Sequence, residues 1–327
     1  MTKGTAPNYA DVISAACNIR QHIHPTPLLK SPILDEVVGG RVLIKTETLQ
    51  RTGSFKFRGA FNKISRLATK TGNTNIVAWS SGNHAQAVAA AARVVGLSAA
   101  IVMPQDAPKA KVDGTLAQGG EVIFYNRDKE SREKIGTRVA NERNATIVPP
   151  YDDPAVIAGQ GTVGLEAASQ ALAEDMIPDT ALIPCGGGGL VAGCAIALKT
   201  QFPSIRVHPV EPQGFDDTTR SLASGKRVKN STEPRSICDS LLISTPGELT
   251  FKINLEHLAQ GIVVTDEQVL SAMRFAFQNL KLVVEPGGAI ALAALLADKS
   301  SYRNKTVLII LSGGNVDDAI FRRALNG

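Results

Sequence analysis

The residue of this chain whose surroundings best suit it to covalent chemistry is Lys56. It lies between Phe55 and Phe57 in residues 52–60 (TGSFKFRGA). Aromatic neighbours that exclude water disfavour the charged ammonium, and the pKa of a lysine falls readily on burial. A lysine made partly neutral is a nucleophilic amine that forms Schiff bases with carbonyl compounds. Most lysines are simply solvated surface charges, so this interpretation requires a site for such a compound elsewhere in the chain.

Four consecutive glycines lie in residues 184–190 (PCGGGGL), directly after an expected strand and directly before an expected helix. Glycines let several backbone N–H groups converge, and the N-terminus of the following helix adds its positive end. This arrangement predicts a phosphate site. A flexible linker or a tight turn is the alternative, although a linker is not expected between a buried strand and an apolar helix. No Gly-Lys-Ser/Thr follows, which excludes a Walker A loop.

A competing glycine pattern, residues 159–164 (GQGTVG), fits the dinucleotide-binding fingerprint. That fingerprint needs a strand before it and an acidic residue at the end of the next strand. Residues 155–158 make a poor strand, and the next clear strand ends in Pro184 and Cys185. The pattern therefore supports a nicotinamide-dependent dehydrogenase only weakly.

Two further polar segments follow expected strands, at residues 80–84 (SSGNH) and 312–315 (SGGN). Short donors at a helix N-terminus suit a carboxylate or phenolate oxygen, and a plain helix cap is the alternative. Ser312 ends the last strand, where open α/β sheets place ligands. It can hydrogen-bond a ring nitrogen, or it can belong to an ordinary turn.

The elements that must position these residues alternate between strand and helix. Such alternation predicts βαβ units, a parallel sheet and an α/β fold, with residues of about 53–147 forming a small domain. Residues 213–246 are expected to be irregular. The expected strands are residues 41–45, 76–79, 99–103, 121–125, 146–148, 181–183, 206–210 and 306–311. The expected helices are residues 9–23, 56–70, 84–95, 109–118, 129–143, 154–173, 190–199, 266–279 and 288–296.

The composition of the 327 residues fits a folded protein with ample core, since 43% are apolar and 20% are charged. The net charge of +5 is scattered along the chain without a run of like charges, so we expect no nucleic-acid partner. The four cysteines show no CxxC spacing, and the first residues lack the apolar region of a signal peptide. Glycines and Pro184 interrupt the longest uncharged stretch, residues 180–198. We therefore expect a cytoplasmic protein without a membrane partner.

Taken together, residues 54–60, 80–84, 155–162 (AVIAGQGT), 186–189 and 312–316 closely resemble the fold-type-II pyridoxal phosphate enzymes. The similarity is to their serine/threonine dehydratase and serine racemase branch, and it runs over nearly the whole chain. It implies a two-domain, tryptophan synthase β-like α/β fold in which each domain is a mostly parallel sheet flanked by helices. It also implies pyridoxal 5′-phosphate as cofactor, a small amino-acid substrate and a homodimer. The implied domains are residues 1–52 with 148–327, which bind the cofactor, and a small mobile domain of residues 53–147.

The resemblance also implies a role for each site residue. Lys56 would hold the cofactor and then move the Cα proton of the substrate, and Ser81 would be the acid/base on the opposite face in a racemase. The implied cofactor contacts are Phe55 at the ring, Asn83 at the 3′-oxygen, Ser312 at the pyridine nitrogen, and Gly186, Gly187, Gly188, Gly189 and Leu190 at the phosphate. The implied substrate-binding residues are Ser54, Ser80, Ser81, His84 and Tyr151.

Residues 211–217 (EPQGFDD) are similar to the divalent-cation site of this branch. By position the ligands would be the carboxylates of Glu211 and Asp217 and the backbone carbonyl of Phe215. Oxygen ligands of this kind suit hard cations, so Mg²⁺ is expected, with Ca²⁺ or Mn²⁺ as alternatives. An acidic surface turn is the other interpretation.

The expected reaction is dehydration of a 3-hydroxy-L-amino acid such as threonine or serine to a 2-keto acid and ammonia, the chemistry of an EC 4.3.1 ammonia-lyase. A neutral serine at the ring nitrogen weakens the electron sink, which favours rapid loss of a β-leaving group over a long-lived carbanion. Tyr151, where racemases of the branch carry asparagine, also favours a dehydratase. A serine or aspartate racemase is the alternative. Residues 237–243 (ICDSLLI) depart from the usual sequence beside the cofactor, so 3-hydroxyaspartate and phenylserine are alternative substrates.

Overall fold

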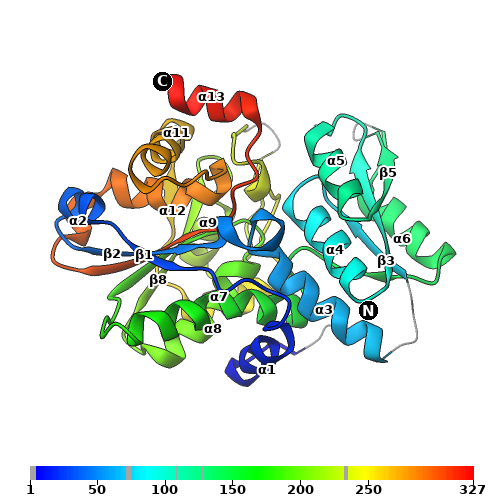
Figure 1. Ribbon diagram of the computed structural model, residues 1–327, viewed down its shortest axis with the longest axis horizontal. Helices are drawn as coiled ribbons and strands as arrows, with labels where there is room; N and C mark the ends of the chain where they lie inside the picture. The colour runs from blue at the N-terminus through cyan, green and yellow to red at the C-terminus, as the bar shows by residue number, and fades with distance from the viewer. Residues whose placement is uncertain (1–4, 71–74, 108, 127–128, 232–234) are drawn as a thin grey trace.

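The computed structural model describes residues 5–70, 75–107, 109–126, 129–231 and 235–327. Two open sheets with helices on both faces form two lobes that lie side by side (Figure 1). All strand pairs but one are parallel among the described residues, so the predicted α/β class with parallel sheets is confirmed.

The larger lobe is built on a six-stranded sheet in the order β1-β2-β10-β7-β8-β9, in which only β1 runs antiparallel to its neighbour. Along β10, Val307 and Ile309 belong to one hydrophobic core and Leu308 and Ile310 to another, because successive strand residues point to opposite faces. A parallel sheet covered on both faces needs such continuous apolar strands. The strands are β1 (Leu28–Lys30), β2 (Arg41–Thr46), β7 (Thr180–Pro184), β8 (Arg206–Pro212), β9 (Ile262–Val264) and β10 (Thr306–Leu311).

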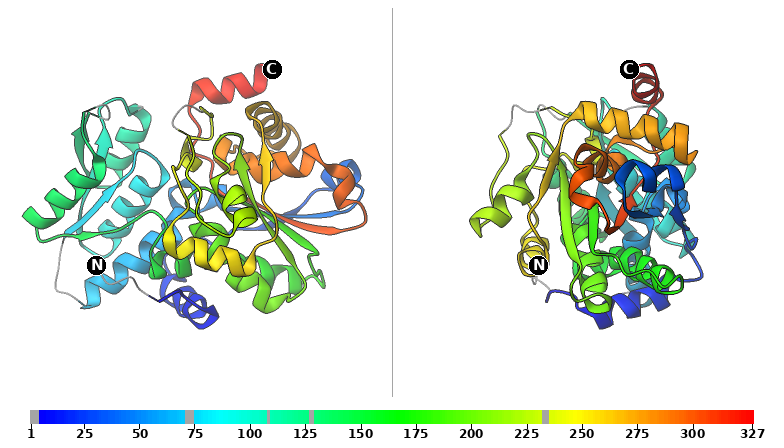
Figure 2. Two further views of the ribbon diagram at one scale, coloured as in Figure 1. Left: turned by 180° about the vertical axis from the view of Figure 1, so that it is seen from behind. Right: turned by 90° about the vertical axis from the view of Figure 1, so that its left-hand side faces the viewer.

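Helices cover both faces of this sheet. One face packs on α2 and α12, with α11 against α12 and α13 against α11 farther out. The other face packs on α7 and α8, and α1 and α10 lie outside these two helices (Figure 2). A π-helical turn, Ala276–Leu280, continues α11. The helices are α1 (Tyr9–Ile19), α2 (Pro32–Val38), α7 (Pro154–Leu172), α8 (Gly189–Gln201), α9 (Asp217–Ser224), α10 (Glu248–His257), α11 (Asp266–Phe275), α12 (Pro286–Ala297) and α13 (Asp318–Asn326).

The smaller lobe carries a parallel four-stranded sheet in the order β5-β4-β3-β6. Ile76 and Ala78 of β3 pack towards α3 and α4, whereas Val77 between them packs towards α6. The strands are β3 (Asn75–Trp79), β4 (Ser98–Pro104), β5 (Glu121–Tyr125) and β6 (Thr146–Ile147). The helices are α3 (Lys56–Lys70), α4 (Asn83–Val94), α5 (Lys109–Ala117) and α6 (Arg132–Glu142).

Helix α3 connects the lobes, because it packs both on α4 of the smaller lobe and on α7 of the larger one. The contact with α7 is close: a Cβ added to Gly59 would lie 2.7 Å from the carbonyl oxygen of Val156. The predicted domain boundaries at residues 53 and 147 fall on either side of the four-stranded sheet and remain a prediction.

The glycines that fit the dinucleotide fingerprint lie inside α7, as the expected helix over residues 154–173 implies. A Cβ on Gly161 would come within 2.7 Å of the Gly193 carbonyl oxygen of α8, and one on Gly159 within 2.6 Å of the Gly59 Cα. These glycines therefore allow close packing of three helices and form no strand-to-helix loop, so the structure gives no support to a dinucleotide site there.

Several elements differ from the sequence-based expectation. Helix α1 ends at Ile19 instead of residue 23, and residues 213–246 are not wholly irregular, since they contain α9 and a 3₁₀ turn, Asp239–Leu241. Helices α2, α10 and α13 and the three-residue strands β1 and β9 were not expected. Short edge strands are fixed by pairing with a distant neighbour, which a local sequence pattern does not reveal.

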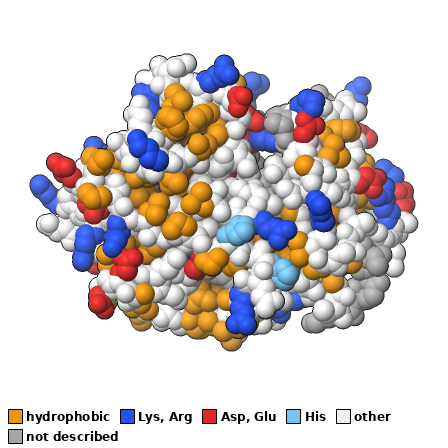
Figure 3. All heavy atoms as spheres, in the orientation of Figure 1, with side chains coloured by type: hydrophobic (Ala, Val, Ile, Leu, Met, Phe, Trp, Pro, Cys, Tyr) orange, Lys and Arg blue, Asp and Glu red, His pale blue; other side chains and the backbone are white. Residues whose placement is uncertain are grey.

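One face of the molecule shows how the charged side chains are distributed. Figure 3 shows basic and acidic side chains scattered and mixed over one face of the molecule. Within the described part of the chain, every helix is too short or too polar to cross a bilayer.

Candidate active site

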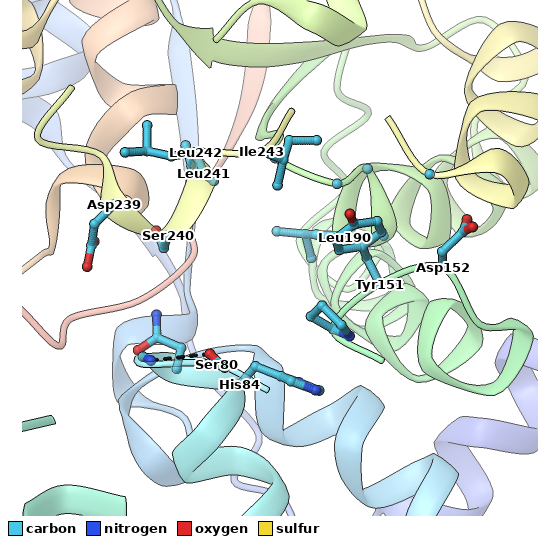
Figure 4. A pocket seen from close by; sticks show the side chains of 18 of the residues that line it. Ser80, His84, Tyr151, Asp152, Leu190, Asp239, Ser240, Leu241, Leu242 and Ile243 are labelled. Carbon is cyan, nitrogen blue, oxygen red and sulfur yellow. Dashed lines mark hydrogen bonds between the residues drawn. The ribbon is translucent and has the colours of Figure 1, made fainter. Parts of the chain in front are cut away.

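A cavity of about 850 Å³ brings together the motifs that were far apart in the sequence. It is lined by the segments that follow β3, β7 and β10, which is the edge where open α/β sheets place ligands. Figure 4 shows Tyr151 and Leu190 on one side of this cavity and Asp239 and Ser240 on the other. The predicted site residues that line it are Phe55, Lys56, Ser80, Ser81, Asn83, His84, Tyr151, Gly186, Gly187, Gly188, Gly189, Leu190, Phe215 and Ser312.

Lys56 is the first residue of α3, and its side chain is half-buried in the cavity. Its Nζ donates a hydrogen bond to the Pro150 carbonyl oxygen at 2.8 Å and lies 5.1 Å from the centroid of the Phe55 ring. Burial lowers the pKa of Lys56 to about 8, against the opposing charge of Glu285. The amine is therefore partly neutral near neutral pH, as the aromatic neighbours predicted.

The four glycines form the turn between β7 and α8, and Gly188 adopts φ +87°, a conformation that favours glycine. A Cβ on Gly187 would lie 2.2 Å from the nearest atom of the Tyr151 ring. The Thr250 hydroxyl donates to the Gly187 carbonyl oxygen at 2.7 Å, which fixes the turn from the side of α10. The first N–H groups of α8 have no partner within the helix and no side-chain cap at Gly188, so the turn fits an anion such as phosphate.

Asn83 begins α4 and is held on both sides of its amide group. Its Oδ1 accepts from Asn315 Nδ2 at 2.8 Å, and its Nδ2 donates to Glu285 Oε1 at 2.5 Å. Asn315 in turn donates to the Thr52 carbonyl oxygen at 2.8 Å. These contacts join the ends of β3 and β10 and the Lys56 loop into one polar network beside the cavity.

Glu285 is the most important site residue that sequence reasoning missed. It precedes α12, lines the cavity and is 4% exposed. Burial and then the charge of Asp239 raise its pKa to about 8, although the Asn83 hydrogen bond and Lys111 oppose this. The carboxyl group is therefore mostly protonated at neutral pH. The available sequence signal was an acidic residue between an apolar run and Pro286, at a helix start.

His84 lies in the first turn of α4 and is buried. Its Nε2 is 2.9 Å from the Val148 carbonyl oxygen, so Nε2 carries the proton of the neutral ring. Burial and the nearby charge of Lys56 lower the pKa of His84 to about 3. Its Nδ1 has no hydrogen-bond partner within the described residues and remains available as an acceptor.

The serines of the three motifs are placed differently. Ser80 and Ser81 line the cavity, and the Ser80 hydroxyl accepts from the Gly82 N–H at 3.2 Å. Ser312 also lines it, and its carbonyl oxygen accepts from the Phe55 N–H at 3.1 Å. Ser54 is fully buried and does not line the cavity.

Tyr151 is held in place by the two residues that follow it. Asp152 Oδ1 accepts from the N–H groups of Leu249 and Thr250 at 2.8 and 3.1 Å and thereby caps α10. Asp153 caps α7 through the Ala155 N–H at 2.9 Å. Each cap satisfies helix N–H groups that lack an internal partner. The ring of Tyr151 therefore covers the glycine turn from a fixed backbone.

Glu211, near the end of β8, and Asp217, the first residue of α9, are both fully buried, and neither lines the main cavity. Burial and Asp217 raise the pKa of Glu211 to about 7, and burial raises that of Asp217 to about 6. Asp217 Oδ2 has no hydrogen-bond partner among the described residues. Two buried carboxylates with an unpartnered oxygen fit the donor set of a hard divalent cation. The described residues contain no group of three or more His, Cys, Asp and Glu side chains arranged for a metal.

One ion pair joins the two lobes across the cavity. Lys111 of α5 contacts Asp239 of the larger lobe and lies 3.6 Å from Asp317, which precedes α13. Burial lowers the pKa of Lys111, but Asp239 outweighs this and the net shift is upward. Sequence reasoning did not single out any of these three residues.

Comparisons with known proteins give one consistent picture. Residues 19–313 match the family described as pyridoxal-phosphate dependent enzyme. The chain is 40% identical to L-threo-3-hydroxyaspartate ammonia-lyase of Saccharomyces cerevisiae, with 98% of this chain and 97% of the relative covered. It is 41% identical to serine racemase of Schizosaccharomyces pombe, with 95% of each covered. The crystal structure of a T.th. threonine deaminase is 42% identical and has a TM-score of 0.89, with 95% of this chain and 99% of that chain covered.

Proposed function

The chain belongs to the family of pyridoxal-phosphate dependent enzymes, and on that premise we propose that it dehydrates a 3-hydroxy-L-amino acid to a 2-keto acid and ammonia. The family and the fold class expected from the sequence are confirmed. The observation that carries the proposal is the meeting, in one cavity, of the Lys56 amine, the glycine turn and a neutral Ser312.

The residues present fit the cofactor. The glycine turn and the N-terminus of α8 form a cradle for the phosphate in which a Cβ on Gly187 would overlap Tyr151. The second N–H of the Asn83 amide is available for the 3′-oxygen, since the orientation of that amide is fixed by Asn315 and Glu285. When bound, pyridoxal phosphate supplies an electron sink for charge that develops at the substrate Cα.

The chain's own residues then divide the work of proton transfer and substrate binding. Lys56, partly neutral at its lowered pKa, removes the Cα proton. Ser80, Ser81 and the α4 N-terminus bind the substrate carboxylate, because short hydroxyl and N–H donors at a helix start suit an anion. Neutral His84 adds no positive charge there and accepts a hydrogen bond through Nδ1.

A racemase is the second candidate, and the similarity to the S. pombe serine racemase favours it. Ser81 would then serve as the acid/base opposite Lys56. The side chain that covers the glycine turn is the aromatic Tyr151, which supports the dehydratase. Chiral analysis of recovered substrate separates the two activities, because inversion at Cα requires the second acid/base.

The candidate substrates differ in their side chains. Threonine and serine are supported by similarity to the threonine deaminase, and 3-hydroxyaspartate by similarity to the S. cerevisiae ammonia-lyase. Phenylserine remains a candidate. The cavity of about 850 Å³ has room for cofactor and any of these side chains.

We also propose that Glu211, Asp217 and the carbonyl oxygen of Phe215 bind Mg²⁺, Ca²⁺ or Mn²⁺. The support is the pair of buried carboxylates with raised pKa values and the unpartnered Asp217 Oδ2. A cation would neutralise the charge that burial makes costly. The homodimer, which the family resemblance implies, and the cytoplasmic location, which was expected from the sequence, remain predictions.

The direct test is a keto-acid assay over both threonine diastereomers, serine, 3-hydroxyaspartate and phenylserine, with and without Mg²⁺. A 2-keto acid from at least one of these, lost in Lys56→Ala, is expected. Release of no keto acid by cofactor-loaded protein, with no inversion of serine or aspartate, would exclude both candidate functions.

A further inference from the structure

We propose that Arg58 is a positioning residue for Lys56. A buried cluster of two cations and two carboxylates fixes the rotation of α3 about its axis and thereby aims the Lys56 amine into the cavity. This inference rests on the proposed role of Lys56 and does not depend on which amino acid is the substrate.

Arg58 is fully buried and is bound by two carboxylates. Its Nε and Nη2 donate to Glu47 Oε2 and Oε1, both at 2.8 Å, in a bidentate pair. Its Nη1 and Nη2 donate to Glu166 Oε2 and Oε1 at 3.0 and 3.2 Å. Burial opposes the charge, but the two carboxylates outweigh burial and raise the pKa of Arg58. A planar guanidinium with these contacts has one allowed orientation.

The carboxylates are themselves fixed to the larger lobe. Lys45 Nζ, at the end of β2, donates to Glu166 Oε1 at 2.6 Å and to the Thr26 carbonyl oxygen at 2.6 Å. The Thr26 hydroxyl donates to Glu47 Oε1 at 2.6 Å. Lys45 and Arg58 balance the charges of Glu47 and Glu166, so the cluster is neutral as a whole. It joins β2, the turn after it and α7 to the first turn of α3.

Because the two residues lie on one helix, fixing the orientation of Arg58 also fixes the direction of the Lys56 side chain. Arg58 follows Lys56 by two positions, and two residues correspond to a rotation of about 200° around an α-helix. The two side chains therefore leave α3 on nearly opposite sides, Lys56 towards the cavity and Arg58 towards the core of the larger lobe. The Gly59 N–H donates to Gln160 Oε1 of α7 at 3.1 Å, which holds the same turn. Any rotation of this turn would break the bidentate pair.

Stability alone is a weak reason for this cluster. Replacing a buried ion pair by apolar side chains of similar volume is often neutral or stabilising, because desolvation offsets the attraction. A bidentate guanidinium also fixes the orientation of the residue that carries it. Orientation matters here because misplacing a nucleophile by about 1 Å lowers the rate on the order of 100-fold. A buried fork beside the lysine that must reach the cofactor meets that need.

The test compares Arg58→Lys with Arg66→Lys in the cofactor-loaded enzyme. Both variants keep the charge, but Arg66 is only partly buried and makes single hydrogen bonds to Ser14 and Asn62, with no carboxylate partner among the described residues. The measurements on the loaded enzyme are thermal unfolding, the visible absorbance of the lysine-bound cofactor as a function of pH, and kcat and KM. For Arg58→Lys we expect a shifted titration midpoint of the absorbance and a kcat about 100-fold lower with KM within about threefold. For Arg66→Lys we expect wild-type values.

Two outcomes would overturn the proposal. One is an Arg58→Lys protein that melts at a lower temperature yet keeps the wild-type absorbance titration and kcat, which would make the cluster purely structural. The other, if Arg58→Lys does not fold, is a folded Glu47→Gln protein with the same wild-type values, since this change removes the carboxylate of the bidentate pair that holds the guanidinium. Absence of a borohydride-trapped pyridoxyl group on Lys56 of the wild-type enzyme would instead overturn the proposed function.

Discussion

Glu285→Gln should stabilise the cofactor-free protein, and the gain should grow with pH. The carboxyl group is 4% exposed, and its pKa in the folded protein is about 8, against an ordinary value of 4.5. A raised pKa means that the folded state holds the proton more tightly than the unfolded state. Ionisation of Glu285 therefore leaves the free energy of unfolding unchanged below pH 4.5. It lowers that free energy progressively as the pH rises towards 8 and lowers it no further above pH 8.

The size of the effect follows from the same two values. A difference of about 3.5 pH units corresponds to about 5 kcal/mol at 1.36 kcal/mol per unit. Glutamine has nearly the shape of the protonated acid and can still accept the Asn83 hydrogen bond, but it does not ionise. Glu285→Gln should therefore be more stable than wild type by about 1 kcal/mol at pH 5 and by up to about 5 kcal/mol at pH 9.

Urea denaturation of the cofactor-free proteins at pH 5, 7 and 9 measures this difference. Glu36→Gln, on the exposed surface of α2, is the matched control and should show no growth of the difference with pH. Because Glu211 and Asp217 are unchanged in both proteins, their titration cancels in the comparison. A difference between Glu285→Gln and wild type that stays constant from pH 5 to pH 9 would refute the assignment of a neutral carboxyl group to the site.

Three further predictions concern the cofactor and the metal. Lys56→Ala should carry no pyridoxyl group after borohydride treatment, as read by peptide mass, and keto-acid production should fall by at least about 1,000-fold; persistent turnover would contradict the role of this amine. Gly187→Ala should bind pyridoxal phosphate about tenfold or more weakly in a spectroscopic titration, because the added Cβ would lie 2.2 Å from the Tyr151 ring; unchanged affinity would show that the ring moves freely. Mg²⁺ should raise the melting temperature of the wild-type protein, and the rise should be larger above pH 7 than below pH 6 because protons compete for Glu211 and Asp217. It should have little effect on the melting temperature of Asp217→Asn. Equal shifts in both proteins would place the cation elsewhere.

The chemistry of this chain was readable from local sequence because each motif is continuous. In each motif a few consecutive residues indicate the backbone conformation or the type of hydrogen-bond donor. This holds for the glycine turn, the Lys56 segment and the strand ends at Ser80 and Ser312. The buried parallel strands, such as Thr306–Leu311, are equally legible as unbroken apolar runs. Cofactor, fold class and nearly all of the predicted cavity-lining residues followed from these.

Other features depended on pairs that the sequence separates. Asn83 and Glu285 are 202 positions apart, and Lys111 and Asp239 are 128 apart. Their shifted pKa values arise from burial and from neighbours brought in by folding, so no local pattern contains them. Folding also decided the burial of Ser54, which the motif placed at the substrate and which is fully buried and does not line the cavity.

The amino-acid order thus determined which groups are available for chemistry, since side-chain type and backbone freedom are local properties. Only the tertiary structure decided the charge states and the orientation of these groups. The pKa of Lys56, the protonation of Glu285 and the orientation of α3 all depend on packing between segments that are distant in the chain.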